Sequence, residues 1–314
     1  MPELDAQYRA MREQAGLLAR DDRGKLKLTG GEAAEYLQSQ ITNEVEALEP
    51  GRGCYAALLD RKGHVRGDMR VLVLRPNDLW LDAEQAGTET LRRHLQTYKL
   101  GRQVELEDVS SGWSIVSLIG PAAAEVAGVA APSPEHAQRF FERAGIELLA
   151  VATDLGLDLL ARAEQSARLR SVLLDSGAVE VSEEAAEILR VESGRPRFGL
   201  DFGAESMPAE AGIVERAVDF KKGCYIGQEP VARLHYRGKP NRRLGGLRLS
   251  APVERGATLR LGDREVGTVG TAVVSPRFGA IALAVVRREA EPGDVLQVGE
   301  GEAEATVGPS PAFA

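Results

Sequence analysis

The chain has 314 residues, of which 43% are hydrophobic and 27% charged, and its formal net charge is −8. This length suggests two or three packed units, and the ordinary globular composition excludes a disordered chain. The negative charge argues against a protein whose main role is to coat nucleic acid, because that role needs a basic surface.

The first hundred residues alternate between helical and strand periodicity. Thr29 and Glu32 form a capping-box pattern, which predicts that a helix begins here. Strands are predicted over 54–59, 69–74 and 79–81. A second helix would place Leu91, Leu95 and Tyr98 on one face. This mixed order with short connections favours an α+β module over regular βαβ units.

A second mixed module follows, and the texture of the sequence then changes. Strands are predicted over 113–119, 146–151 and 157–160, a loop over 131–134 and a helix over 164–174. From Leu244 onward, short β-type runs alternate with glycine or proline turns, which predicts a small all-β barrel or sandwich. The boundary before it falls within 237–243.

The cysteines and the N-terminus bear on location. Cys54 and Cys224 are too few for a disulfide scaffold or a four-thiolate metal site, so we expect no metal and a reducing compartment. Residues 1–14 are charged and lack the apolar region of a signal peptide. No apolar run approaches the ~20 residues that cross a bilayer. We therefore expect a soluble, cytoplasmic protein without a membrane partner.

Glu192 holds an unusual position in a helix predicted over 183–192. The apolar stripe of this helix consists of Ala185, Ile188 and Leu189, and the next position on the same stripe is Glu192. A buried carboxylate needs a partner because burying an unpaired charge is costly. Three interpretations stay open: a ligand contact, a helix that ends before Glu192, or an ion pair with Arg190, Arg195 or Arg197.

A second candidate is the run Lys222-Gly-Cys-Tyr-Ile-Gly-Gln-Glu229. Gly223 and Gly227 bracket the Cys-Tyr-Ile core and permit a sharp turn or a close approach to a ligand. Lys221 and Lys222 would raise the thiolate fraction of Cys224. The alternative is a structural cysteine in a turn-rich loop.

Positive charge is concentrated just downstream of this run, in Arg233, His235, Arg237, Lys239, Arg242 and Arg243. Such a cluster is unusual in an acidic chain. It predicts either a solvated linker surface or an anion site for a polyglutamate tail, a phosphate or RNA.

Asp68 is the last candidate. It closes the turn over 61–68, between two predicted strands. A carboxylate here could face a pocket, or it could be an ordinary turn residue.

The run from Lys222 to Glu229 resembles the signature of the YgfZ family of folate-binding proteins. The segment Leu189-Arg-Val-Glu-Ser-Gly-Arg-Pro196 is similar to the stretch that precedes that signature. The runs Leu37-Gln-Ser-Gln-Ile-Thr-Asn43 and Gly238-Lys-Pro-Asn-Arg-Arg-Leu244, together with Arg233, also fit. The resemblance covers nearly the whole chain.

The resemblance implies the α+β, three-part ring fold of the aminomethyltransferase, the T-protein of the glycine cleavage system. Two mixed modules and a C-terminal barrel would surround a central tetrahydrofolate site. We therefore expect a folate-binding domain over 1–240, made of modules 1–103 and 104–240, and a barrel domain over 241–314.

The resemblance also implies roles for the candidate residues. Glu192 would hold the pterin ring of tetrahydrofolate or of a one-carbon derivative, with Tyr225 and Arg233 as further folate contacts. Cys224 would be the reactive thiol within the signature loop, which consists of Lys222, Gly223, Gly227, Gln228 and Glu229. The anion or partner patch would consist of Arg237, Lys239, Arg242 and Arg243.

Asp68 marks a departure from the aminomethyltransferase. In that enzyme the matching turn carries paired aspartates, one of them catalytic, whereas this chain has Gly67 and Asp68. One carboxylate is thus absent, and whether Asp68 takes the catalytic position depends on a one-residue choice of alignment.

The function implied first is that of a folate-dependent accessory protein without ordinary turnover. It would serve the assembly or repair of iron–sulfur clusters, including those of tRNA-modifying enzymes. Its partners would be iron–sulfur enzymes or cluster-assembly proteins, with tRNA as an indirect partner. The alternative is a tetrahydrofolate-dependent aminomethyltransferase or other one-carbon transferase, and a third class is an RNA-binding module.

Overall fold

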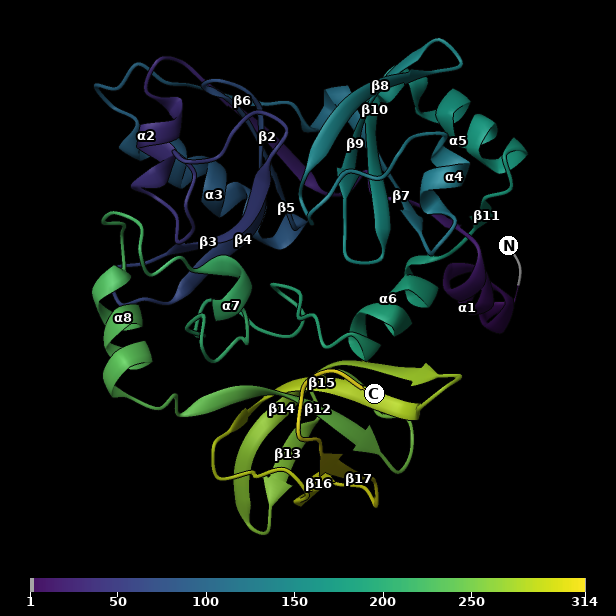
Figure 1. Ribbon diagram of the computed structural model, residues 1–314. Helices are drawn as coiled ribbons and strands as arrows, with labels where there is room; N and C mark the ends of the chain where they lie inside the picture. Colours follow the sequence, from purple (N-terminus) through teal and green to yellow (C-terminus); the bar gives the residue numbers. More distant parts are fainter. Residues whose placement is uncertain (1–2, 314) are drawn as a thin grey trace. The chain divides into compact units, whose positions relative to one another are not determined.

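The computed structural model describes residues 3–313 and divides the chain into two compact units. The first unit comprises residues 3–58, 67–185 and 221–226, and the second comprises 59–66, 186–220 and 227–313. Figure 1 shows the course of the chain through both. Within the described residues, no helix is both long and apolar enough to span a membrane.

The first sheet of the first unit has the strand order β3-β4-β5-β2-β6. Its strands are β2 (Gly24–Thr29), β3 (Gly53–Leu59), β4 (Val65–Arg75), β5 (Asp78–Ala83) and β6 (Glu105–Asp108). Two helices pack against it, α2 (Ala33–Gln38) and α3 (Gln85–Tyr98). Tyr36 of α2 and Leu91 of α3 share one buried cluster with strand residues such as Leu81.

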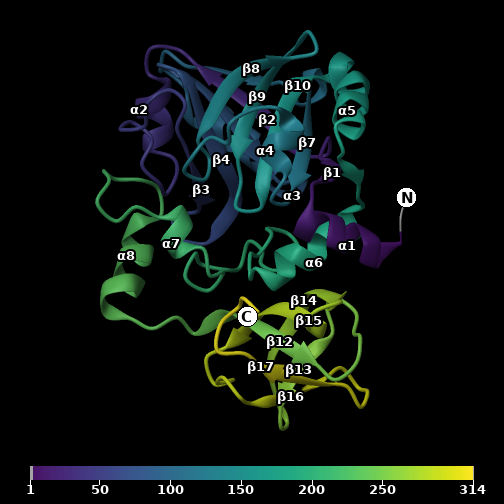
Figure 2. The same cartoon turned by 45° about the vertical axis from the view of Figure 1, so that its right-hand side comes forward.

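The second sheet of this unit has the order β11-β1-β7-β10-β9-β8. Its strands are β1 (Gly16–Ala19), β7 (Trp113–Ile119), β8 (Gln138–Arg143), β9 (Ile146–Ala152), β10 (Gly156–Arg162) and β11 (Val179–Glu180). The helical elements beside it are α1 (Leu4–Glu13), η1 (Ser110–Gly112), α4 (Ala123–Ala127), η2 (Ala163–Gln165) and α5 (Ser166–Asp175). Leu169 and Leu173 of α5 pack against its strands. Figure 2 shows α5 beside this sheet from another side.

The two sheets pack against each other through a shared apolar cluster that contains Leu72, Trp80, Ile115 and Leu160. The strand β1 belongs to the second sheet, where it pairs with β7 and β11, although it precedes the whole first sheet in sequence. Nothing in the sequence pattern indicated that this strand would join the second sheet.

Buried charges bridge the two sheets beside this cluster. Arg70 of β4 donates to Asp82 Oδ2 at 2.8 Å and to Asp158 Oδ2 of β10 at 2.5 Å. Arg23 pairs with both Asp82 and Glu84. Asp82 is fully buried, and although burial raises its pKa, the charges of Arg23 and Arg70 outweigh that effect and lower the pKa to about 2.

The second unit is built on a closed barrel with the order β12-β15-β14-β13-β16-β17. Its strands are β12 (Arg242–Leu249), β13 (Thr258–Leu261), β14 (Arg264–Ser275), β15 (Gly279–Arg287), β16 (Val295–Val298) and β17 (Glu304–Val307). The helices α7 (Val214–Ala217) and α8 (Gln228–Arg237) precede it, as does most of α6 (Glu183–Glu192). Val191 of α6 packs with Leu244, Ile281 and Leu283 of the barrel.

These observations confirm the predicted α+β class, with two mixed modules and a C-terminal barrel. Two local predictions were wrong. Thr29 ends β2, so the capping box does not form, and α2 begins at Ala33 with Glu32 at its N-cap. Tyr98 is 48% exposed and does not share the buried face of Leu91 and Leu95. The helix α8 was not predicted.

Candidate functional site

Glu192 lies inside the second unit and is only 4% exposed. The helix α6 continues through it, so the interpretation of an early helix end is wrong. At the other end of this helix, the Ser182 hydroxyl accepts the N–H of Ala185 at 3.2 Å and serves as the N-cap. The apolar stripe therefore carries the carboxylate into a buried setting, as its spacing predicted.

Ser275 fixes the orientation of this carboxylate. Its hydroxyl donates to Glu192 Oε1 at 2.6 Å. Ser275 Oγ itself accepts the backbone N–H groups of Arg277 and Phe278, each at 3.0 Å. With both acceptor positions taken, the hydroxyl proton can only point at the carboxylate. Sequence reasoning missed Ser275 because it is 83 residues away from Glu192.

Arg190, one of the ion-pair partners considered for Glu192, is bound to other carboxylates. Arg190 Nη1 donates to Asp201 at 2.6 Å and Nη2 donates to Glu187 at 2.7 Å. The C-terminal segment packs on the end of α6, where the N–H of Phe313 donates to the carbonyl of Glu192 at 2.8 Å. Gly194 is required here, since a Cβ would lie 2.5 Å from the nitrogen of Ala312.

Asp68 belongs to the first unit and lies within β4, because the strand begins earlier than predicted, at Val65. It is 6% exposed, and its Oδ2 accepts the hydroxyl of Tyr55 at 2.6 Å. Its Oδ1 is buried and has no hydrogen-bond partner among residues 3–313. A buried polar atom left unsatisfied costs stability, and a catalytic role is one of the reasons for which a folded protein keeps such an atom.

The environment of Asp68 suits proton transfer near neutral pH. Burial raises the pKa of its carboxyl group to about 6. The hydrogen bond from Tyr55 and the charge of Arg23 act in the opposite direction, while the charge of Glu84 adds to the increase. A carboxyl group with a pKa close to the working pH can serve as a general acid or base.

Lys222 anchors the signature loop within the first unit. Its buried ammonium group donates to the carbonyls of Gln38 at 2.6 Å, Ile41 at 2.7 Å and Asn43 at 3.0 Å. These carbonyls lie at and just beyond the C-terminal end of α2, where a positive charge is favourable. The contact therefore links the run over 37–43 directly to the signature.

Tyr225 is a second residue with an unsatisfied buried atom. It is 8% exposed, and its hydroxyl has no hydrogen-bond partner in the described chain. Burial raises its pKa to about 12, so the hydroxyl stays protonated and available as a donor. The ammonium group of Lys222 lies 5.1 Å from the centre of its ring. Tyr225 thus offers an unused donor, as Asp68 offers an unused acceptor.

The two cysteines differ in access. Cys224 is exposed in the loop, whereas Cys54 is only partly exposed and its Sγ lies 3.6 Å from the carbonyl of Glu44. Burial raises the pKa of Cys54 to about 12, although the nearby charge of Lys222 acts in the opposite direction. The charge of Lys222, which was expected to act on Cys224, thus also acts on Cys54.

Iodoacetamide at pH 7.5 should alkylate Cys224 at least about tenfold faster than Cys54, because the thiolate is the reactive form and Cys54 is held protonated. Mass spectrometry of the wild type, with Cys224→Ser and Cys54→Ser as controls, would measure both rates. Equal alkylation rates at the two thiols would contradict the difference in solvent exposure between Cys224 and Cys54.

The helix α8 carries the end of the signature. Gly227 precedes it with a φ of 83°, and a Cβ there would lie 2.4 Å from the carbonyl oxygen of Asp60, so only glycine fits. Gly223 has nothing within 4 Å of its Cβ position. Gln228 and Glu229 form the first turn, and Glu229 Oε1 accepts from exposed Arg233 at 2.5 Å. Such a surface pair is weak and leaves Arg233 accessible.

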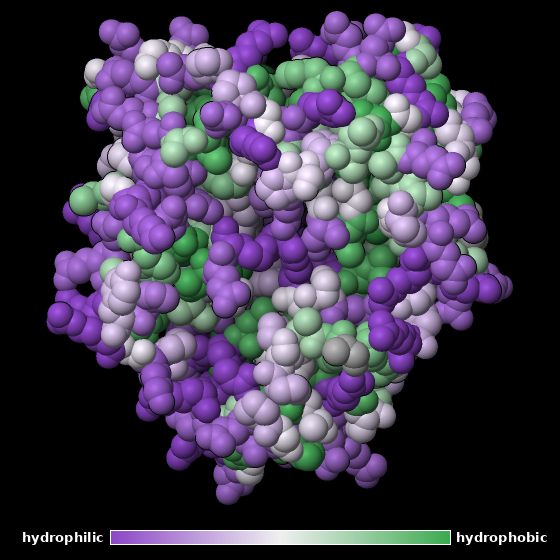
Figure 3. Space-filling model, in the orientation of Figure 1, coloured by the Kyte–Doolittle hydropathy of each residue, from purple (hydrophilic) through white to green (hydrophobic). Residues whose placement is uncertain are grey.

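The structure divides the predicted anion patch. Arg237 and Lys239 are exposed at and after the end of α8, where the surface is largely hydrophilic (Figure 3). Arg243 donates to the carbonyl of Ala290 at 2.8 Å within the barrel. Arg242 instead lines a surface pocket described below.

The predicted site residues thus fall into two groups. Asp68, Lys222, Gly223, Cys224 and Tyr225 belong to the first unit, and Glu192, Gly227, Gln228, Glu229 and the basic residues belong to the second. Among residues 3–313, no group of three or more His, Cys, Asp or Glu side chains is arranged to hold a metal ion.

Comparisons with known proteins agree over most of the chain. Residues 2–222 match the family described as the GCVT N-terminal domain, and residues 242–313 match the glycine cleavage T-protein C-terminal barrel domain. An aminomethyltransferase of Geobacillus kaustophilus is 30% identical over 91% of this chain and 83% of its own length. An aminomethyltransferase of Saccharopolyspora erythraea is 28% identical over 93% of this chain and 84% of its own length.

A solved structure agrees in fold. The glycine cleavage system aminomethyltransferase T of Bartonella henselae aligns with 98% of this chain and 89% of its own, with a TM-score of 0.87 and 21% identity. Both domain matches and a relative of this similarity lead to one conclusion: the chain belongs to the glycine cleavage T-protein family, with its N-terminal domain and its C-terminal barrel domain.

Proposed function

We propose that this protein binds tetrahydrofolate or a one-carbon derivative and transfers a one-carbon unit, of the aminomethyl type, to it. The observation that carries the proposal is Asp68, a buried carboxyl group with a pKa of about 6 and an unsatisfied oxygen. The folate supplies the nitrogen atoms that receive the one-carbon unit. Asp68 would hold or balance a proton at such an atom.

The unsatisfied polar atoms fit such a ligand. A folate offers ring N–H and amino groups that the oxygen of Asp68 can accept, and acceptors toward which the Tyr225 hydroxyl can donate. The carboxylate of Glu192, held by Ser275, is suited to accept two hydrogen bonds from a pterin. Arg233, Arg237 and Lys239 are proposed to face the acidic tail.

A direct assay tests the transfer. The protein, tetrahydrofolate and an aminomethylated dihydrolipoyl carrier protein should yield methylene-tetrahydrofolate, free dihydrolipoyl carrier and ammonia. Ammonia release that requires both the folate and the protein is the expected result. Folate binding without any release would refute the transferase and leave the second candidate.

The second candidate is a folate-dependent accessory role in the assembly or repair of iron–sulfur clusters, including those of tRNA-modifying enzymes. The exposed thiol of Cys224 in the anchored signature loop favours it. Deleting the gene and measuring iron–sulfur enzymes under oxidative stress tests this role, and unchanged activities would refute it.

The cytoplasmic location and the domain boundary near residue 240 stay predictions.

Glu192→Gln should weaken tetrahydrofolate binding by roughly 1.5–3 kcal/mol, or about ten- to a hundredfold, because a charged acceptor is lost. Calorimetric titration measures the change. The matched control is Glu184→Gln on the exposed side of the same helix, which should bind as the wild type does. Equal affinities in all three proteins would remove Glu192 from the folate site.

A further inference from the structure

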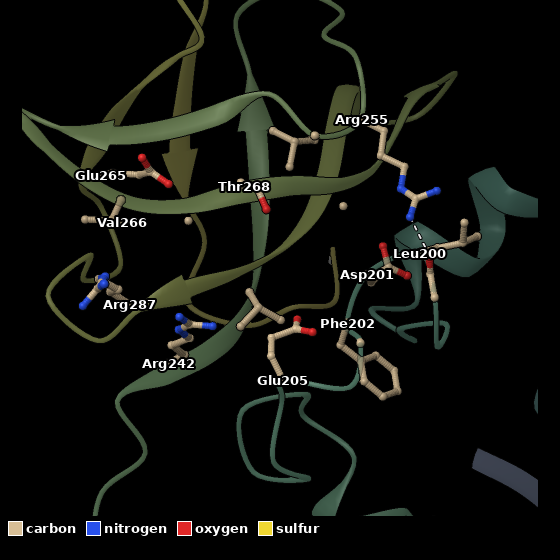
Figure 4. A pocket seen from close by; sticks show the side chains of 17 residues that line it. Leu200, Asp201, Phe202, Glu205, Arg242, Arg255, Glu265, Val266, Thr268 and Arg287 are labelled. Atoms are coloured by element: carbon tan, nitrogen blue, oxygen red, sulfur yellow. Dashed lines mark hydrogen bonds between the residues drawn. The ribbon is translucent and has the colours of Figure 1, made fainter. Parts of the chain in front are cut away.

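A pocket of about 620 Å³ lies in the second unit, and Arg242 is the one site residue predicted from the sequence that lines it. One wall is formed by strands of the barrel, and the other by the loop over 199–205 together with Arg255 (Figure 4). A volume in this range suits a small organic ligand.

Two arginines stand side by side on the strand wall. Arg242 of β12 is the direct pairing partner of Arg287 of β15, so their side chains share one face of the barrel. Val286 belongs to the buried core, and its neighbour Arg287 must therefore point outward, together with Val285. Thr268 pairs with Val285 and joins the same face.

This pair of like charges has no internal compensation. Like charges directly opposite on adjacent strands are destabilising. No hydrogen bond or ion pair within the described residues engages the guanidinium group of Arg242 or Arg287. By contrast, Arg243 is bound to the carbonyl of Ala290, and Arg255 donates to the carbonyl of Gly199 at 2.5 Å.

The opposite wall is fixed and does not neutralise the pair. Asp201 accepts hydrogen bonds from Arg190 at 2.6 Å and from the N–H groups of Arg197 and Thr271, each at 2.8 Å. This carboxylate is therefore committed. The loop closes further through the N–H of Gly199, which donates to the carbonyl of Phe202 at 2.8 Å.

Two glutamates, Glu205 and Glu265, also line the pocket, and neither pairs with Arg242 or Arg287 in the described chain. The pocket lining thus carries three arginines and three carboxylates, of which Asp201 is already bonded to Arg190. The glutamates disfavour an extended polyanion such as RNA and leave room for a small anion.

We propose that this pocket binds a small organic anion whose carboxylate or phosphate group lies between Arg242 and Arg287. The ligand is independent of the folate, since Arg287 and the loop over 199–205 are not among the predicted folate contacts. Guanidinium groups favour planar or tetrahedral oxyanions because each can donate two parallel hydrogen bonds.

Calorimetric titration of the full chain with inorganic phosphate and with citrate, at constant ionic strength, tests the proposal. Saturable binding of at least one is expected, and the two arms distinguish a phosphate from a carboxylate site. Arg242→Gln and Arg287→Gln should each weaken this binding by about tenfold or more. The matched control is Arg264→Gln, an exposed arginine of β14 that does not line the pocket.

Two further measurements sharpen the result. Glu265→Gln should tighten anion binding because a repulsive charge is removed, and Arg287→Gln should keep the tetrahydrofolate affinity of the wild type. No saturable binding of either anion, or binding that survives both arginine substitutions, would overturn the proposal. A failure of folate binding in the wild type would overturn the proposed function instead.

Discussion

Asp68→Asn should lose most of the transfer activity and yet fold more stably than the wild type at neutral pH. An asparagine keeps the shape of the side chain and can still accept the Tyr55 hydroxyl, but it cannot exchange a proton. Loss of a general acid or base costs roughly 10²–10⁴-fold in rate. A structural residue would not combine lost activity with gained stability.

The gain in stability follows from the raised pKa of about 6. Ionising Asp68 in the folded state is harder than in the unfolded chain, whose aspartates titrate near pH 4. The penalty is therefore absent below about pH 4, grows as the pH rises and is complete above about pH 6. It reaches roughly 1–3 kcal/mol, which Asp68→Asn would recover.

Urea unfolding of both proteins from pH 4 to pH 8 measures this difference, which should grow with pH. Tyr55→Phe is the second variant, because the Tyr55 hydrogen bond lowers the pKa of Asp68. Its removal should shift the acidic limb of the pH–rate profile upward and leave the carboxyl group in place. Stability curves that stay parallel at every pH would refute the buried, ionisable Asp68.

Asp82→Asn should destabilise the chain by about 3–5 kcal/mol, since it leaves Arg23 and Arg70 buried with too little negative charge. The charges of these arginines hold the pKa of Asp82 at about 2. Its contribution is thus present above about pH 4 and disappears as the pH falls toward 2, a change of about 2 kcal/mol. Chemical unfolding at several pH values measures both effects.

The matched control for Asp82 is Glu89→Gln. Glu89 also holds two arginines, Arg92 and Arg93, but on the exposed surface of α3. Solvent screens that group, and its replacement should leave the stability nearly unchanged. Similar losses of stability in the two variants would mean that the buried ion pairs between the sheets stabilise the fold no more than the exposed ones do.

Features that show as a regular spacing of apolar residues could be predicted from the sequence. The barrel was predicted because short β-type runs alternate with glycine or proline turns after Leu244, and the structure has strands such as β13 and β16 in this region. Glu192 was placed in a buried setting because it continues an apolar stripe. These features depend on residues within one or two turns of each other.

Long-range contacts were beyond this reasoning. The partners of Lys222 lie about 180 residues away in sequence, and Ser275 lies 83 residues from Glu192. The unsatisfied atoms of Asp68 and Tyr225 likewise depend on packing, which no local pattern reveals. The missed helix α8 begins after the signature glycine, and its polar composition concealed it.

The position of β1 sets an order of events during synthesis. This strand leaves the ribosome early, but its neighbour β7 begins 94 residues after β1 ends. At roughly 5–20 residues per second, its edges stay unpaired for on the order of ten seconds. The nascent chain therefore carries an exposed apolar strand while the intervening sheet is made. This interval is when the protein is most open to misassociation and to capture by chaperones.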